Sequence, residues 1–402
     1  MTKLANNKLK SYSYILVTSI TLNTLQVAAE DELFTPYAHV SVALDDNVFL
    51  QSDEELLNNP IDDQTDAEDT VTEYGAGLRT DITSSSQHYL LSFDAYRRDY
   101  SEFDRLNFTG GNINAKWDWY LNKKWDGEIS YLFKREQSNL GDQRLINGDV
   151  YDLNQAKIKA IRHTSANNEI YIAAIFRNKE YEERQNLDND QTNIALGYKY
   201  ISPKNNSIAL ELRGAEGESS NSSNLLTSLP TLTNYEQGSI NVITGWKTSA
   251  GDNLKFEIGY VTRDHDAQFN EFDYNGVVLE FDHLWKIANR TQLKWGFGRK
   301  LNNTENTVTL FTKEDFGFIN AEWAATQRIK FNLNLNYREV DFTQINDDRD
   351  DEISSLELNS TYRWTPNIDL NVSIKSQNRD SSRIENEYDN LVAMLSLSYN
   401  IE

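Results

Sequence analysis

The chain has 402 residues, a length that suggests two or three domains unless one large β architecture takes up all of it. With 39 Lys and Arg against 62 Asp and Glu, its net charge of -23 argues against a nucleic-acid-binding surface, and the lack of Cys excludes disulfides and thiolate chemistry. A mean hydropathy of -0.65 excludes a bundle of membrane helices, whereas a membrane β-barrel is allowed because its strands are only half apolar.

Residues 1–29 have the pattern of a secretory signal peptide. Three lysines lie within the first ten residues, residues 12–25 are mostly apolar, and residues 27–29 supply the small side chains that precede a cleavage site. Five Ser, Thr and Asn residues between positions 18 and 24 make the apolar stretch too polar for a lasting transmembrane helix. We therefore expect residues 1–29 to direct export across an inner membrane and residues 30–402 to form one domain.

After residue 30, apolar and polar side chains alternate in one segment after another. In residues 329–337, for example, Ile, Phe, Leu, Leu and Tyr alternate with Lys, Asn, Asn and Asn, which predicts a strand with one apolar and one polar face. Eighteen segments are predicted to be strands: 36–44, 70–81, 88–99, 107–119, 125–136, 151–163, 169–179, 191–202, 207–216, 236–247, 253–264, 274–285, 291–300, 314–325, 328–341, 353–364, 368–378 and 389–401.

The connections between these segments alternate between short and long. Short turns such as 121–124, 287–290 and 365–367 are followed by longer loops rich in acidic residues, Asn and Ser, such as 45–69 and 217–235. Short turns on one side and long loops on the other are typical of outer-membrane barrels, whose short turns lie in the periplasm. A soluble β-sandwich has no reason to keep this asymmetry.

Tryptophan positions give a third indication. Each Trp lies within about six residues of a predicted short turn, and Trp rings prefer the headgroup level of a membrane. The predicted membrane-interface girdle comprises Trp117, Trp119, Trp125, Trp246, Trp285, Trp295, Trp323 and Trp364.

These patterns together predict an all-β fold, a transmembrane antiparallel up-and-down β-barrel of eighteen strands in the outer membrane of a Gram-negative bacterium. Sixteen strands are the alternative if segment 36–44 or 107–119 is not a strand. In such a barrel the apolar faces meet lipid, the polar faces line a lumen, and closure leaves no unpaired strand edge in hydrocarbon.

Catalytic and metal sites find little support in the sequence. The five His residues fall on separate predicted strands without an H-E-x-x-H motif, and the glycine pairs at 75–77 and 296–298 lie inside strands rather than before a helix. No G-x-S-x-G motif is present. We expect no enzyme activity, no cofactor and no bound catalytic metal.

Segment 45–69 contains ten acidic residues and no basic residue. A solvated, mobile loop is the simplest interpretation, since acidic residues keep a surface soluble. The alternative is that divalent cations bridge these carboxylates to anionic lipopolysaccharide or polymer, because hard cations such as Ca²⁺ prefer oxygen ligands.

Inward-facing charged and amide residues are the candidates for selectivity. Their signs are mixed, and the amide groups could donate and accept hydrogen bonds to sugar hydroxyls or simply provide a wetted wall. The lumen candidates are Glu128, Lys134, Lys255, Glu257, Glu280, Asp282, Lys294, Lys330, Asn332, Asn334, Asn336, Arg338, Glu357, Arg363, Asn371 and Lys375.

A short motif, Asp45-Asp46-Asn47-Val48-Phe49, follows the first predicted strand. With the signal peptide and a barrel over residues 36–402, it resembles the outer-membrane β-barrel porins encoded with exopolysaccharide-biosynthesis systems. The resemblance implies a passive component of polysaccharide export, without catalytic residues. The chain ends in Asn400-Ile401-Glu402, whereas such barrels commonly end in an aromatic residue.

Three functions therefore remain open. The leading hypothesis is a conduit or accessory pore in exopolysaccharide export, which implies polysaccharide and periplasmic export components as partners. The second is a general diffusion porin for small solutes, and the third is a surface adhesion or interaction barrel that works through acidic loops. Outer-membrane lipid and lipopolysaccharide are expected partners in each case, and nucleic acid is not.

Overall fold

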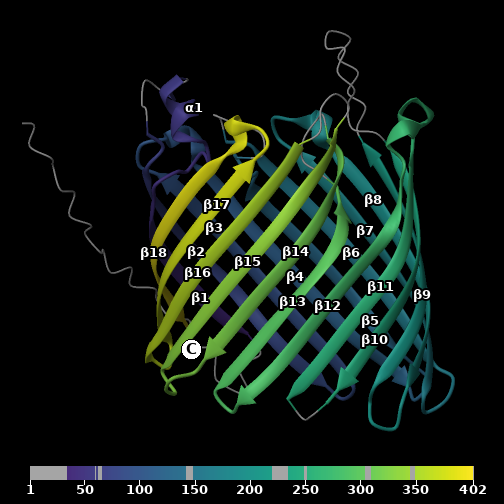
Figure 1. Ribbon diagram of the computed structural model, residues 1–402. Helices are drawn as coiled ribbons and strands as arrows, with labels where there is room; N and C mark the ends of the chain where they lie inside the picture. The colour runs from purple at the N-terminus through teal and green to yellow at the C-terminus, as the bar shows by residue number, and fades with distance from the viewer. Residues whose placement is uncertain are drawn as a thin grey trace, which may run out of the picture. The chain divides into compact units, whose positions relative to one another are not determined.

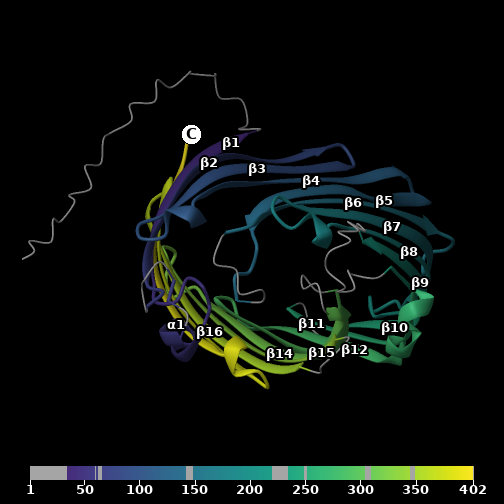
Figure 2. The same ribbon diagram turned by 90° about the horizontal axis from the view of Figure 1, so that it is seen from above.

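The computed structural model describes residues 34–58, 60–61, 66–141, 148–219, 234–248, 251–303, 309–344 and 349–401. Across these residues eighteen strands form one sheet in which each strand pairs with its neighbours in the chain, and β1 pairs with both β2 and β18 (Figures 1 and 2). The sheet is therefore a closed antiparallel barrel, and the prediction of eighteen strands is confirmed. The predicted signal peptide, residues 1–29, lies outside the described residues.

The strands are between 11 and 17 residues long. They are β1 Thr35–Asp45, β2 Asp69–Ser84, β3 Gln87–Tyr100, β4 Phe108–Asn122, β5 Trp125–Gln137, β6 Val150–His163, β7 Asn168–Tyr181, β8 Asn189–Ile201, β9 Ser207–Ser219, β10 Tyr235–Lys247, β11 Asp252–His265, β12 Tyr274–Ala288, β13 Thr291–Asn302, β14 Thr309–Trp323, β15 Ile329–Gln344, β16 Arg349–Thr365, β17 Ile368–Ser381 and β18 Tyr388–Asn400. The helices are α1 Asp53–Asn58 and the 3₁₀ turns η1 Asp104–Leu106, η2 Gln185–Leu187, η3 Ala267–Phe272 and η4 Ile384–Asn386. None of these helices is long and apolar enough to cross a membrane.

The two ends of the barrel differ in the length of their connections. At the end where β18 finishes, two to five residues join successive strands, and Ser85 and Asn205 adopt the positive φ angles of tight turns. At the opposite end, the connections have four to twenty-three residues. We call these the short-turn end and the long-loop end, and they match the alternation seen in the sequence.

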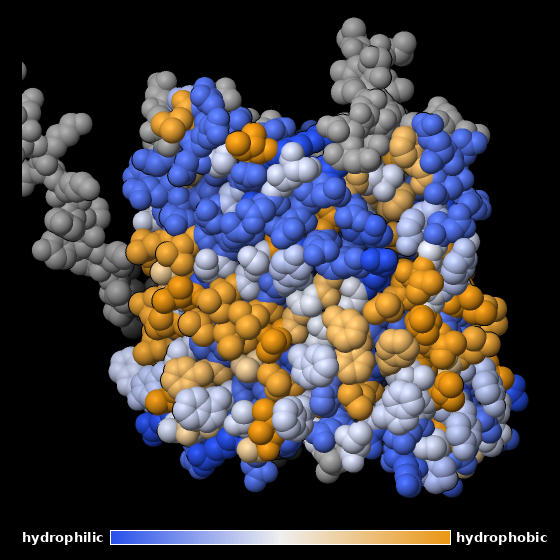
Figure 3. Space-filling view, viewed as in Figure 1, coloured by the Kyte–Doolittle hydropathy of each residue, from blue (hydrophilic) through white to orange (hydrophobic). Residues whose placement is uncertain are grey.

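The outward face is apolar over part of its height. Large exposed side chains such as Phe93, Leu196, Leu212 and Leu395 lie on the outward parity of their strands. Figure 3 shows a band of hydrophobic residues across the visible face of the barrel. Hydrophilic side chains cover the wall on the long-loop side of this band. An apolar band around a closed barrel is the surface that meets lipid in a transmembrane β-barrel.

The polar part of the outer wall carries ion pairs between neighbouring strands. Arg299 on β13 donates from Nε and Nη2 to the carboxylate of Asp315 on β14 at 2.6 and 2.5 Å, and Lys313 pairs with Asp341 on β15. Because these groups are partly exposed, each pair contributes little stability, about 0–1 kcal/mol. The ion pairs indicate that this part of the wall lies in water rather than in hydrocarbon.

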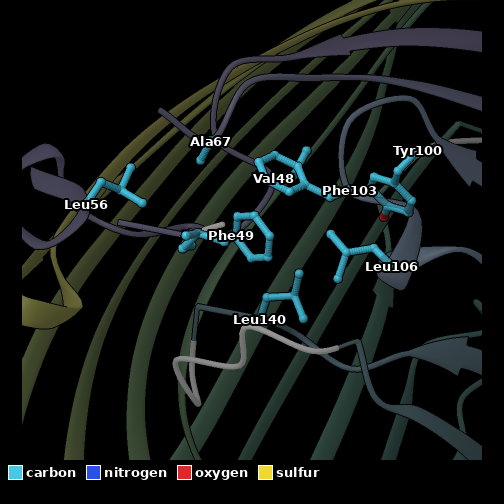
Figure 4. Close-up of a cluster of buried hydrophobic side chains, with 9 residues drawn as sticks. Val48, Phe49, Leu56, Ala67, Tyr100, Phe103, Leu106 and Leu140 are labelled. Atoms are coloured by element: carbon cyan, nitrogen blue, oxygen red, sulfur yellow. The ribbon is translucent and has the colours of Figure 1, made fainter. Parts of the chain in front are cut away.

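Segment 46–68 differs from the solvated loop expected from its acidic composition. Its apolar residues, together with the β3–β4 and β5–β6 loops, form a loop core made of Val48, Phe49, Leu56, Ile61, Ala67, Tyr100, Phe103, Leu106 and Leu140 (Figure 4). Phe49 is fully buried and its ring meets that of Phe103 edge to face at 4.7 Å. Burying these apolar groups outweighs the tendency of the acidic residues to stay solvated, so the expectation of a fully solvated loop is wrong for the described residues of this segment.

The Asp45–Phe49 motif lies at the seam where the barrel closes. Asn390 on β18 donates to the Asp45 carboxylate at 2.6 Å, and the backbone N–H of Leu391 donates to the Asp46 carboxylate at 2.7 Å. The Asn47 side-chain amide donates to the backbone oxygen atoms of Gln51 and Asp389, both at 2.8 Å. The motif therefore joins the first strand, the last strand and the loop core.

Adjacent residues on β15 provide a test of which face meets lipid. Leu333 lies at the centre of the outward apolar row from Ile329 to Tyr337, whereas Asn334 faces the lumen and donates to Glu357 at 3.3 Å. We expect Leu333→Arg to destabilise the barrel by about 2–4 kcal/mol, because the charge would lie in hydrocarbon. Asn334→Arg should cost far less, because its side chain meets water, but it should change conductance.

Equilibrium refolding of both variants into lipid vesicles measures the difference. A larger loss of stability for Asn334→Arg than for Leu333→Arg would show that the two faces of β15 are assigned the wrong way round.

Candidate functional site

The inward face of the barrel carries the candidate site, and strand alternation places the sequence-predicted lumen residues on it, opposite the exposed apolar rows. They lie on β5 (Glu128, Lys134), β11 (Lys255, Glu257), β12 (Glu280, Asp282), β13 (Lys294), β15 (Lys330, Asn332, Asn334, Asn336, Arg338), β16 (Glu357, Arg363) and β17 (Asn371, Lys375).

Only some of these residues meet one another. Glu257 accepts from Arg213 on β9 at 2.7 Å and lies 3.5 Å from Lys255, so their charges offset one another. Lys294 lies over the Phe318 ring at 5.3 Å. The predicted set is therefore spread around the wall instead of forming one cluster.

A cavity of about 540 Å³ lies inside the barrel, in its long-loop half. Its walls come from the loop-side ends of strands β7 to β11 and β13 to β18, and Asn139 of the β5–β6 loop completes the lining. Its charged lining residues are Arg177, Arg263, Lys300, Glu314, Arg338 and Arg379. Five cations and one carboxylate thus line a cavity in a chain whose net charge is -23.

Most of the charged residues that line the cavity are absent from the lumen set predicted from the sequence. Of the predicted lumen set, Arg338 is the member that lines this cavity. Arg263 lies inside the predicted strand 253–264 and on the same face of β11 as Lys255 and Glu257, so following the inward-facing positions to the loop end of that strand would have found it. Following the inward-facing positions of β7 and β13 in the same way leads to Arg177 and Lys300.

Arg263 is buried, with 3% of its surface exposed. Its Nε and Nη2 donate to the Gln237 side-chain oxygen at 2.9 and 2.7 Å, and its Nη1 donates to Asn303 at 3.0 Å. The guanidinium also lies 4.3 Å from the centre of the Tyr235 ring. Amide and aromatic groups orient this cation, but they do not neutralise its charge.

Glu314 is the carboxylate of the cavity, and it is shared. Lys300 Nζ lies 3.1 Å from its Oε1 and Arg338 Nη1 lies 3.8 Å from its Oε2, while Asn302 donates to Oε2 at 2.9 Å. The Glu314 side chain is only 6% exposed. The single negative charge of Glu314 is therefore shared by Lys300 and Arg338.

Next to the cavity, Asp351 on β16 is enclosed by two guanidinium groups. Arg349 donates to both its oxygens at 2.9 and 2.7 Å, Arg379 Nε donates to Oδ2 at 2.8 Å, and Ser381 donates to Oδ1 at 2.5 Å. All three charged side chains are 2% exposed or less. This cluster holds Arg379 in position at the edge of the cavity.

The eight Trp residues predicted as a girdle lie on the outward face, toward the short-turn ends of their strands, and six of them are more than a third exposed. The other two pack against neighbouring strands: Trp119 covers Gly127, where an added Cβ would come within 2.4 Å of the indole, and Trp295 donates to His283 at 3.1 Å. The level of the membrane boundary stays a prediction.

Among the described residues, no group of three His, Asp or Glu side chains is arranged to hold a metal ion. His265 lies inside the barrel wall and stacks on Phe311 at 5.7 Å, and His39 lies 3.2 Å from Asp94. These histidines take part in packing and hydrogen bonding.

The chain forms a closed antiparallel barrel with an apolar outer band and a charged, amide-rich interior. It is therefore an outer-membrane porin-like channel, located in the outer membrane of a Gram-negative bacterium. The family model described as "Putative beta-barrel porin 2" matches residues 241–400, which make up less than half of the chain. A search of curated proteins found no match.

Solved structures with a similar fold include outer-membrane proteins of Pseudomonas. OpdK of Pseudomonas aeruginosa is 9% identical over 92% of this chain and 98% of its own, with a TM-score of 0.46. A BenF-like porin of Pseudomonas fluorescens Pf-5 is 12% identical over 92% and 99%, with a TM-score of 0.47. OccK9 (OpdG) of Pseudomonas aeruginosa is 9% identical over 92% and 99%, with a TM-score of 0.49.

Proposed function

We propose that the barrel is a passive diffusion channel that carries small hydrophilic solutes across the outer membrane. The observation that carries this proposal is the cavity of about 540 Å³ inside the barrel, to which eight strands contribute charged or amide side chains. Its volume lies in the range of about 300–1,000 Å³ that small-molecule sites occupy. The match of residues 241–400 to a porin family model supports the same class of function.

A conduit for exopolysaccharide export is the second candidate. The Asn-rich inward row of Asn332, Asn334 and Asn336 on β15 favours it, because amides donate and accept the hydrogen bonds that sugar hydroxyls make. The Asp45–Phe49 motif, which suggested this function in the sequence, contacts the closure seam and the loop core. Because those contacts explain its residues structurally, the motif adds little support for a polymer.

Conductance and a deletion strain together test the two candidates. The purified barrel in planar bilayers should give discrete conductance steps that scale with salt concentration, and a deletion strain should take up small hydrophilic solutes more slowly. Normal uptake with loss of extracellular polysaccharide would favour the export conduit. If solute uptake and extracellular polysaccharide were both normal while cells attached less well to surfaces, the adhesion barrel would be favoured.

The proposal includes export of the chain before it inserts. Residues 1–29 would act as a signal peptide and be removed after Ala29, so that the protein recovered from the outer membrane begins at Glu30. N-terminal sequencing of that protein checks this directly, and an intact Met1 would contradict it. Outer-membrane lipid and lipopolysaccharide would be its surroundings.

A further inference from the structure

The cationic groups of the lumen cavity are not matched by carboxylates. Arg263 is 3% exposed, yet its hydrogen bonds go to the neutral side chains of Gln237 and Asn303. Within the described part of the chain, no carboxylate lies within 4.0 Å of its guanidinium. A buried charge without a counter-ion is costly, so an anion that enters the cavity would gain a strong interaction there.

Arg177, which lines the same cavity from β7, is in a similar position. Its Nε atom is buried and donates no hydrogen bond to any of the residues that the structure describes. Lys300 and Arg338 share Glu314 as their carboxylate. Four cations therefore face the cavity with one carboxylate between them, in addition to Arg379, which is bound to Asp351.

The remaining lining indicates what else the anion should carry. Gln191, Asn193, Gln237 and Asn302 add amide groups, which can donate and accept hydrogen bonds at once. Hydroxyl groups are the natural partners of such amides, whereas guanidinium groups bind the flat carboxylate in a two-pronged manner. The ring of Tyr235 adds an aromatic surface.

We propose that this cavity binds small hydroxylated carboxylates, the chemistry of sugar acids, through Arg263 and Arg177, with the amides contacting the hydroxyl groups. The proposal deepens the proposed function, since it names the class of solute that the channel favours. Binding itself does not require that the barrel conduct, so the two can fail separately.

Equilibrium titration of the purified, folded barrel with glucuronate, glucose and inorganic phosphate tests the site, with conductance recorded on the same preparation. We expect glucuronate to bind more tightly than the other two ligands. Arg263→Gln should weaken glucuronate binding by about tenfold, since it removes charge-assisted hydrogen bonds. Glu314→Gln should strengthen it, because Lys300 and Arg338 would lose their shared carboxylate.

Arg299→Gln is the matched control. This residue precedes Lys300 on β13 but lies on the outer wall, where it pairs with Asp315, so its loss should leave binding unchanged. Heat-modifiable migration on a gel confirms that each variant folds.

Equal binding of glucose and glucuronate, tighter binding of phosphate, or equal effects of Arg263→Gln and Arg299→Gln would each overturn the proposal. If glucuronate binds to the wild-type barrel, weakly to Arg263→Gln, and no conductance is found, the binding site stands and the diffusion channel fails.

Discussion

Replacing Asp351 by Asn should destabilise the barrel by about 3–5 kcal/mol, the cost of removing one partner from a buried ion cluster. Asp351 is the carboxylate that both Arg349 and Arg379 contact, and its side chain is fully buried. The substitution keeps the shape of the side chain and removes only its charge, so two buried guanidinium groups lose their common counter-ion. Equilibrium unfolding in urea from lipid vesicles measures the loss.

Asp315→Asn provides the control for this change. It removes the same charge from a two-pronged pair with Arg299 on the outer wall, where the Asp315 side chain is 35% exposed. Solvent screens that pair, so we expect a cost of about 0–1 kcal/mol. Equal losses for the two variants would mean that burial of the Asp351 cluster adds nothing to its energetic importance.

Replacing Phe49 by Ala should loosen the packing of segment 46–68 at the long-loop end without unfolding the barrel. The ring is fully buried in the loop core, and its removal should cost about 3–5 kcal/mol of local stability. The strands are held by their own ladders, so the loss should appear as faster proteolysis and faster hydrogen exchange in segment 46–68. Thermal unfolding of the barrel should change much less.

Leu57→Ala is the comparison for Phe49→Ala. Leu57 lies on α1 in the same segment but is 66% exposed, so its truncation should alter neither proteolysis nor exchange. If both substitutions opened the segment equally, the packing of Phe49 against Phe103 would not be what orders it.

The fold could be predicted because hydropathy alternates with the same period as the side chains of a strand. Segment 328–341 was predicted as a strand and β15 runs from Ile329 to Gln344. The prediction stops at residue 341, three residues short of the strand's end. Its last outward residues, Glu339 and Asp341, are charged, so the apolar row ends at Tyr337 although the ladder with β16 continues to Phe342. Alternation in hydropathy therefore marks the part of a strand that meets lipid, not its full length.

The site was harder to predict, because it depends on which strands contribute side chains to one cavity. Arg177 and Arg263 are on strands β7 and β11, and no local pattern shows that both line one cavity. Of the two partners of Asp351, Arg349 is two residues away in the chain and Arg379 is 28 residues away. The loop core likewise joins three loops, and its few apolar residues have no period that predicts burial.

The position of the Asp45–Phe49 motif has a consequence for the order of folding. The hydrogen bond between Asn390 and Asp45 joins residues 345 positions apart, whereas the ladders from β2 to β18 join neighbours in the chain. Local hairpins form sooner than contacts of such large separation, so these seam bonds should form in the last kinetic step. Substitutions at Asp45 or Asn390 should thus accelerate unfolding while leaving the early folding rate unchanged, and a chain that stalls before this step would expose two unpaired strand edges to aggregation.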